Sequence, residues 1–179
     1  MKDWNTVVTV YQDGFRRALR ALQKLAPAER SPYHNVLEMK ADDPLVLLDA
    51  IEAMTQANPA LYDAISRVAP AARVFDFASE EECVERAKSI LADWVPRLAG
   101  RTFHARWHRR GTEHTVPTQA AERRLDDAVI AATAAAGAAA KISFTDPDMV
   151  IAVDIIDDRA GIGLWTRADL ERYHVLRPD

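Results

Sequence analysis

Residues 149–156, with the sequence MVIAVDII, place the strongest constraint on how this chain folds. A run of mostly β-branched apolar residues of this length is typical of a β-strand. It follows Asp146-Pro147-Asp148, which interrupts regular structure, and precedes residues 157–161, which are rich in turn formers. Because apolar residues resume at 162–165, the sequence predicts a β-hairpin.

Helices and further strands are predicted on both sides of this hairpin. Ser79 followed by three glutamates matches a capping box and begins a predicted helix over residues 79–98. Also predicted are a strand at 101–110, a turn at 111–115, a helix at 117–137, a strand at 141–144 and a short helix at 167–173. We therefore expect residues 79–179 to form an α/β domain with a mixed sheet.

The first half of the chain has its own alternation of strands and helices. The predicted order is a strand at 6–11, a helix at 15–25, a strand at 33–39, a helix between Asp43-Pro44 and Asn58-Pro59, a short helix at 62–68 and a strand at 73–77. This order resembles a ferredoxin-like sandwich. The predicted fold class is α+β, with a ferredoxin-like N-terminal domain at residues 1–78 and a boundary near Ser79.

Composition limits where the protein works. The apolar stretches are too weak or short to span a membrane, the N-terminus lacks a secretory signal, and the single Cys83 cannot form an internal disulfide. We expect a soluble cytoplasmic protein with no membrane partner. The formal net charge of −4 argues against coating nucleic acid by bulk electrostatics.

One stretch of the chain is nevertheless strongly basic. Between residues 101 and 124 only Glu113 and Glu122 oppose the arginines, and His104, His108 and His114 are interspersed. The arginines are Arg101, Arg106, Arg109, Arg110, Arg123 and Arg124. Any nucleic-acid surface is therefore expected here.

The predicted strand at 101–110 divides its side chains between two faces. Phe103, Ala105 and Trp107 should point to the core, while the opposite face carries His104, Arg106, His108 and Arg110. Side chains on one face lie roughly 6 to 7 Å apart, close to the spacing of successive phosphates along a nucleic-acid strand. The alternative is a solvated face whose arginines pair with acids of a neighbouring helix.

The sequence predicts no metal site, no cofactor and no catalytic constellation. His104 and His108 would lie roughly 13 Å apart on a strand, too far to share one ion. No nucleophile elbow or glycine-rich phosphate loop occurs, and Cys83 falls at a helix packing position. The alternative function is a small RNA- or nucleotide-directed enzyme that uses His104 or His108 as its acid or base.

Three segments of the second half together resemble a THUMP domain. They are residues 101–111 (RTFHARWHRRG), 141–156 (KISFTDPDMVIAVDII) and 160–164 (AGIGL). Members of this family accompany enzymes that modify RNA, where the domain binds tRNA and usually follows a ferredoxin-like domain. The family has an Asn-Pro-Asp-like turn where this chain has Asp146-Pro147-Asp148.

The resemblance implies roles for particular residues and a partner. Arg106, Arg109, Arg110 and Lys141 would face RNA, while Pro147, Asp148 and Gly161 would shape the fold. Because no catalytic domain follows Leu176, the arrangement is most similar to stand-alone THUMP proteins. These act as tRNA-binding adaptors for a separate modifying enzyme, an acetyltransferase that forms N4-acetylcytidine.

Overall fold

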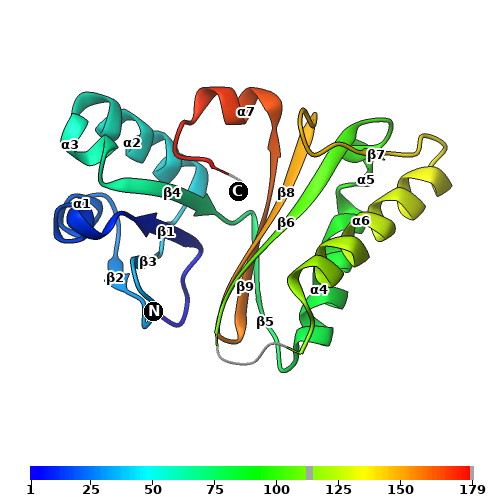
Figure 1. Ribbon diagram of the computed structural model, residues 1–179, viewed down its shortest axis with the longest axis horizontal. Coiled ribbons are helices and arrows are strands. Elements are labelled where there is room, and N and C mark those ends of the chain that lie inside the picture. Colours follow the sequence, from blue (N-terminus) through cyan, green and yellow to red (C-terminus); the bar gives the residue numbers. More distant parts are fainter. Residues whose placement is uncertain (112–114, 178–179) are drawn as a thin grey trace. The chain divides into compact units, whose positions relative to one another are not determined.

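The computed structural model describes residues 1–111 and 115–177, which fold into two compact units (Figure 1). Unit 1 comprises residues 1–72 and 169–177, and unit 2 comprises residues 73–168. The division falls earlier than the boundary predicted near Ser79. The reason is that β5 (Arg73–Asp76) pairs with β9 (Arg159–Thr166) and so belongs to the sheet of unit 2.

Unit 1 is a four-stranded antiparallel sheet in the order β2-β3-β1-β4, with α1 and α2 packed on it. Helix α2 begins where Asp43 accepts hydrogen bonds from the N–H groups of Leu45 and Val46, with Pro44 in its first turn. The elements are β1 (Thr6–Val10), η1 (Gln12–Gly14), α1 (Phe15–Leu22), β2 (Ala28–Arg30), β3 (Val36–Met39), α2 (Pro44–Ala57), α3 (Pro59–Tyr62) and β4 (Ile65–Pro70).

The short helix predicted at residues 62–68 is wrong. Those residues instead lead into strand β4, which pairs antiparallel with β1 so that Val68 lies opposite Val8. Ile65 and Val68 are both fully buried there. The spacing of the apolar residues was compatible with a helix. The segment forms a strand because β1 offers an edge to pair with and β-branched side chains pack well on a pleated sheet.

The C-terminal segment 169–177 completes unit 1 along the edge of β4. The N–H of Val68 donates a hydrogen bond to the carbonyl of Val175 at 2.8 Å. The Tyr173 hydroxyl donates to Asp49 at 2.6 Å, and the His174 ring stacks on Tyr62 at 4.2 Å. The last strand of the sheet is therefore not left with an unpaired edge at this point.

Unit 2 is a mixed five-stranded sheet in the order β5-β9-β8-β6-β7. Strand β6 runs parallel to β8 and to β7, whereas β9 is antiparallel to its neighbours β8 and β5. The predicted hairpin and the predicted mixed sheet are confirmed. The elements not yet bounded are α4 (Glu80–Asp93), α5 (Val95–Leu98), β6 (Thr102–Arg110), α6 (Thr118–Ala135), β7 (Lys141–Ile142), β8 (Met149–Ile156) and α7 (Arg167–Arg172).

The core of unit 2 lies between this sheet and helices α4, α5 and α6, which cover one face (Figure 1). Phe103, Ala105 and Trp107 of β6 all lie in this core, as the alternation of the strand predicts. Ser79 caps α4 by accepting from the N–H of Glu82 at 3.2 Å. The core therefore fixes which side chains of β6 point away from the helices.

Two carboxylates of α6 cover the outer edge of β6. Strand β7 pairs only with Thr102 and Phe103, so the rest of this edge has no strand partner. The N–H of Ala105 donates to Asp126 at 3.1 Å, and that of Trp107 donates to Glu122 at 3.0 Å. The carboxylates satisfy backbone donors that would otherwise be open to another strand.

We expect Asp126→Asn to remove a pH dependence from the stability of the protein. Burial raises the pKa of Asp126 to about 6 from an ordinary value near 3.8. When the pKa of an acid is higher in the folded state than in the unfolded state, protonation of that acid stabilises the folded protein. This contribution to the unfolding free energy is complete below about pH 4 and is lost as the pH rises through 6. The asparagine keeps an oxygen for the N–H of Ala105 and should be about 1–3 kcal/mol more stable than the parent at pH 7.

Urea unfolding of both proteins at pH 4 and pH 7 measures this difference. The change in unfolding free energy between the two pH values should be smaller in the variant, and an identical change in both proteins would contradict the assignment. Asp93→Asn, at an exposed position of α4, is the matched control.

Candidate nucleic-acid interface

The face of β6 away from the helices carries the four side chains that the sequence assigns to it. His104, Arg106, His108 and Arg110 are alternate residues of one continuous strand. Their partners in β8 are Val150, Ala152, Asp154 and Ile156. The structure thus brings the four together as a row.

A buried carboxylate interrupts the positive charge of this row. Asp154, whose side chain is 4% exposed, lies 3.4 Å from the Arg110 guanidinium and is the register partner of His108. The sequence interpretation missed this residue. The sequence nevertheless contained a signal for it, because Asp154 is the single charged residue in the apolar run 149–156.

His104 is buried and uncharged at neutral pH. Its residue is only 4% exposed, and burial lowers its pKa below the ordinary value. The Nδ1–H donates to the carbonyl of Ser143 at 2.9 Å, since a carbonyl can only accept. The ring therefore positions the segment after β7.

That segment presents an exposed aromatic residue which the sequence interpretation also missed. Phe144 is 63% exposed and stacks on His104, with ring centroids 5.9 Å apart. Ile142 is 41% exposed, and both Lys141 and Arg101 are exposed beside it. The backbone N–H of Lys141 donates to the carbonyl of Arg101 at 2.9 Å. We call Arg101, Lys141, Ile142 and Phe144 the β7 edge.

Arg109 lies on the opposite face of β6 from the other predicted contacts. Its side chain is 7% exposed and forms an ion pair with Glu80 at the start of α4. The same carboxylate accepts hydrogen bonds from the Thr115 hydroxyl and the N–H of Val116, each at 2.6 Å. Because odd-numbered residues of β6 point toward the helices, Arg109 is not in the row and holds β6 to α4 instead.

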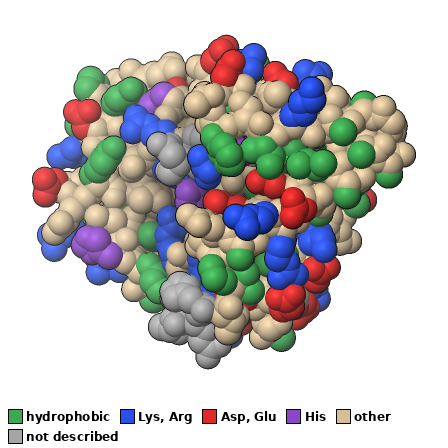
Figure 2. Space-filling view, turned by 45° about the vertical axis from the view of Figure 1, so that its right-hand side comes forward, with side chains coloured by type: hydrophobic (Ala, Val, Ile, Leu, Met, Phe, Trp, Pro, Cys, Tyr) green, Lys and Arg blue, Asp and Glu red, His purple; other side chains and the backbone are tan. Residues whose placement is uncertain are grey.

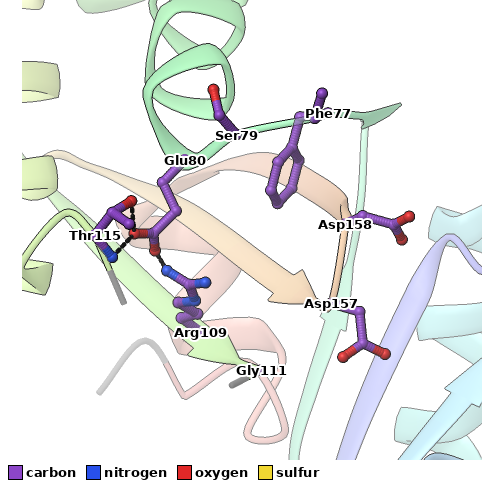
Figure 3. A pocket seen from close by; sticks show the side chains of 9 residues that line it. Phe77, Ser79, Glu80, Arg109, Gly111, Thr115, Asp157 and Asp158 are labelled. Carbon is purple, nitrogen blue, oxygen red and sulfur yellow. Dashed lines mark hydrogen bonds and ion pairs between the residues drawn. The ribbon is translucent and has the colours of Figure 1, made fainter. Parts of the chain in front are cut away.

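This ion pair lies in a pocket of about 520 Å³ at the end of the sheet (Figure 3). Its wall includes Glu80 and Arg109, together with Asp157 and Asp158 from the turn between β8 and β9. Three carboxylates and one guanidinium disfavour a polyanion here. The turn predicted at 111–115 falls largely on residues 112–114, which lie outside the described residues, as does His114.

Asp148 fastens the loop before β8 to the start of β6. Its carboxylate accepts from the backbone N–H of Thr102 at 2.9 Å and from the Thr102 hydroxyl at 3.0 Å. These hydrogen bonds lower the pKa of Asp148. Arg167 pairs with Asp146 at 3.0 Å and with Asp148 at 3.3 Å. Pro147 is half-buried between the two aspartates.

Gly161 occupies a central position in the sheet. It lies opposite Asp154 of β8 on one side and Val74 of β5 on the other, and it is buried. The structure therefore separates the three residues predicted to shape the fold, with Pro147 and Asp148 at one end of β8 and Gly161 in the middle of β9.

Elsewhere on unit 2, acidic and basic side chains are interspersed (Figure 2). Arg124 of α6 bridges to Glu81 and Glu85 of α4 at 2.7 and 2.8 Å, and Arg86 pairs with Glu82. By contrast, Arg101, Arg106 and Lys141 make no side-chain hydrogen bond or ion pair within residues 1–111 and 115–177. Of the arginines and the lysine predicted to contact RNA, Arg106 and Lys141 are thus left without an ion pair among the described residues, and Arg101 of the β7 edge is a further such cation.

Reactive groups are sparse in the part of the chain that the structure describes. No group of three His, Cys, Asp or Glu side chains there could hold a metal ion. Cys83 is fully buried in the core, and burial raises its pKa to about 12. None of the described helices is long and apolar enough to cross a membrane.

Comparison with known proteins defines the class of unit 2. The THUMP domain family model matches residues 77–164, the segment that includes α4, β6, α6 and the hairpin β8–β9. Residues 77–164 of this protein form a THUMP domain. No curated protein matches the chain.

Solved structures share the fold of both units at low sequence identity. PH1313 from Pyrococcus horikoshii Ot3 matches 89% of this chain with a TM-score of 0.62 and 13% identity. A 4-thiouridine synthetase in complex with RNA and bound ATP matches 89% with a TM-score of 0.59 and 14% identity. TrmN from Thermus thermophilus matches 89% with a TM-score of 0.57 and 19% identity. This chain spans 53%, 40% and 44% of those three chains, respectively.

We expect Arg109→Ala to destabilise the protein by about 3 kcal/mol, because it leaves the Glu80 carboxylate buried without its cation. Arg106→Ala should cost less than about 0.5 kcal/mol, since that side chain has no ion-pair partner among the described residues. Urea unfolding at pH 7 measures both values. Equal losses in the two variants would contradict the different roles assigned to the two arginines.

Proposed function

We propose that this protein binds folded RNA through the β7 edge and Arg106. The observation that carries the proposal is the coincidence, within a THUMP domain, of an exposed Phe144 with cations that form no ion pair with a described carboxylate. Lysine and arginine bind phosphates, while an exposed aromatic ring stacks on an unpaired base. RNA offers both phosphates and bases, and the β7 edge has a group for each. Among the described residues, the acidic pocket of unit 2 and the ion-paired surface of α4 and α6 do not combine an exposed aromatic ring with a cation that forms no ion pair.

We further propose that the RNA is a tRNA and that the protein works in the cytoplasm as a non-catalytic adaptor. One of the similar structures supports this, since it is a 4-thiouridine synthetase solved with RNA. The partner would be a separate tRNA-modifying enzyme such as a cytidine acetyltransferase. Unit 1 would serve as a ferredoxin-like domain, in agreement with its β-α-β-β-α-β order. Sequencing the RNA recovered with the tagged protein tests the choice of tRNA.

The geometry of His104 supports an adaptor over an enzyme that uses this residue as acid or base. The imidazole is buried, its Nδ1–H is already donated to Ser143, and no carboxylate forms a hydrogen bond with the ring in the described chain. A general acid or base must reach the proton that it transfers. Stacking under Phe144 is the function that this position allows.

Removing two cations should weaken RNA binding about tenfold. For Arg106→Ala/Lys141→Ala we expect the slope of log affinity against log salt concentration to become shallower by about 1.5, because two phosphate contacts are lost. Fluorescence anisotropy with labelled tRNA at 50 to 300 mM salt measures both quantities. Arg86→Ala/Lys88→Ala removes the same charge from α4 and is the control. Equal losses in the two double variants would contradict the proposed surface.

Replacing the exposed aromatic ring should reduce binding without affecting stability. Stacking of one base on an aromatic side chain is worth about 1–3 kcal/mol, so Phe144→Ala should bind RNA roughly tenfold more weakly, while Phe144→Trp should bind as well as the parent. The slope against salt should not change, because no phosphate contact is removed. An alanine variant that binds like the parent would exclude Phe144 from the interface.

A further inference from the structure

Unit 1 contains a pocket of about 430 Å³ between the start of α1 and the loop that joins β2 to β3. Gln12, Phe15 and Arg30 line it together with loop residues 31–35. This pocket lies outside residues 77–164, so the THUMP family match does not cover it. Its volume falls in the range of small-molecule sites, about 300–1,000 Å³.

The loop that forms one wall is held in a defined conformation. The Ser31 hydroxyl accepts from the N–H of Tyr33 at 3.0 Å, and the N–H of Ser31 donates to the carbonyl of Val36 at 3.0 Å. Asn35 has a φ of 58°, in the left-handed region that asparagine tolerates better than most residues, and its carbonyl accepts from the N–H of Val10. The wall is therefore preformed by backbone hydrogen bonds.

The pocket carries positive charge and aromatic surface but no acid. The Arg30 guanidinium lies 4.5 Å from the centre of the Phe15 ring, and Tyr33 and His34 belong to the same wall. None of the lining residues is acidic. The pocket of unit 2 instead includes Glu80, Asp157 and Asp158. Of these two pockets, the one in unit 1 is suited to an anion.

A line of basic residues continues from this pocket along α1. Arg16 and Arg20 are exposed and four residues apart, so they share one face of the helix, and exposed Lys24 follows just after it. None of the three makes a hydrogen bond or an ion pair within the described residues. Like charges at this spacing destabilise a helix by about 0.2–0.5 kcal/mol, and Arg16 in the first turn opposes the helix dipole, whereas Arg20 in the last turn is favourable to it. A row of cations without ion pairs favours a long anion over a single small one.

We propose that this pocket is a second RNA site, which binds one unpaired nucleotide while Arg16 and Arg20 contact the backbone that leads to it. Arg30 would hold a phosphate through its planar fork of N–H donors, and the base would stack on the aromatic wall. This inference rests on the proposed RNA-binding function. It adds a site in unit 1 and a preference for RNA that contains unpaired nucleotides.

The test compares Arg30→Gln with Lys2→Gln, which removes one exposed positive charge elsewhere in unit 1. Both full-length variants are titrated with a labelled RNA hairpin that has a four-nucleotide unpaired tail and with the same hairpin lacking the tail. We expect Arg30→Gln to bind the tailed hairpin about tenfold more weakly, with little change for the blunt hairpin. Lys2→Gln should lose less than about twofold on either RNA. Unchanged thermal melting of both variants establishes that they are folded.

Several results would overturn the proposal. Equal affinities of Arg30→Gln and Lys2→Gln for the tailed hairpin would exclude the pocket as an RNA site, while binding lost through Arg106→Ala/Lys141→Ala would show that the proposed function still stands. If the parent protein bound neither hairpin, the proposed function itself would fail. Saturable binding of inorganic phosphate or adenosine monophosphate that Arg30→Gln abolishes, with no effect on tailed RNA, would identify a small-anion site and contradict the assignment to RNA.

Discussion

The parallel pairing of β6 with β8 is the constraint on which unit 2 depends. Its register places Phe103, Ala105 and Trp107 under the helices and turns His104, Arg106 and His108 the other way. A shift of one residue would exchange these two sets and bring guanidinium groups into an apolar core. The register therefore decides the position of every charged side chain of the basic strand, including Arg109, which points to the helix side and is paired there with Glu80.

Carboxylates from other elements of unit 2 form ion pairs or hydrogen bonds with much of this basic strand. Glu80 pairs with Arg109, and Asp154 pairs with Arg110, while Asp126 and Glu122 occupy the backbone donors along the edge of β6. The contacts of Asp126 and Glu122 stabilise a sheet edge that no full-length strand covers. Arg101, Arg106 and Lys141 form no such ion pair with the described residues, so the proposed RNA surface is smaller than the basic stretch of sequence and lies nearer its beginning.

The two proposed RNA sites use the same chemistry on unrelated elements. At the β7 edge, buried His104 supports an exposed Phe144 beside Lys141 and Arg101. In unit 1, Arg30 lies over Phe15 beside a loop fixed by backbone hydrogen bonds. A cation next to an aromatic ring suits a nucleotide because it meets a phosphate and a base at once. Such local sites would allow a chain with a net charge of −4 to bind a polyanion.

The sequence by itself determined the elements of unit 2, because the apolar run 149–156, the capping box at Ser79 and the alternation of β6 are local signals with local causes. It also indicated a THUMP domain through motifs that the family match confirms at 77–164. Only the tertiary structure decided that residues 65–70 form a strand and that β5 joins β9, because each depends on a partner far away in the chain. The tertiary structure also decided whether each cation forms an ion pair. Arg109, Arg110 and Lys141 have the same charge in the sequence, and they differ because packing places Glu80 and Asp154 beside the first two and leaves the third exposed.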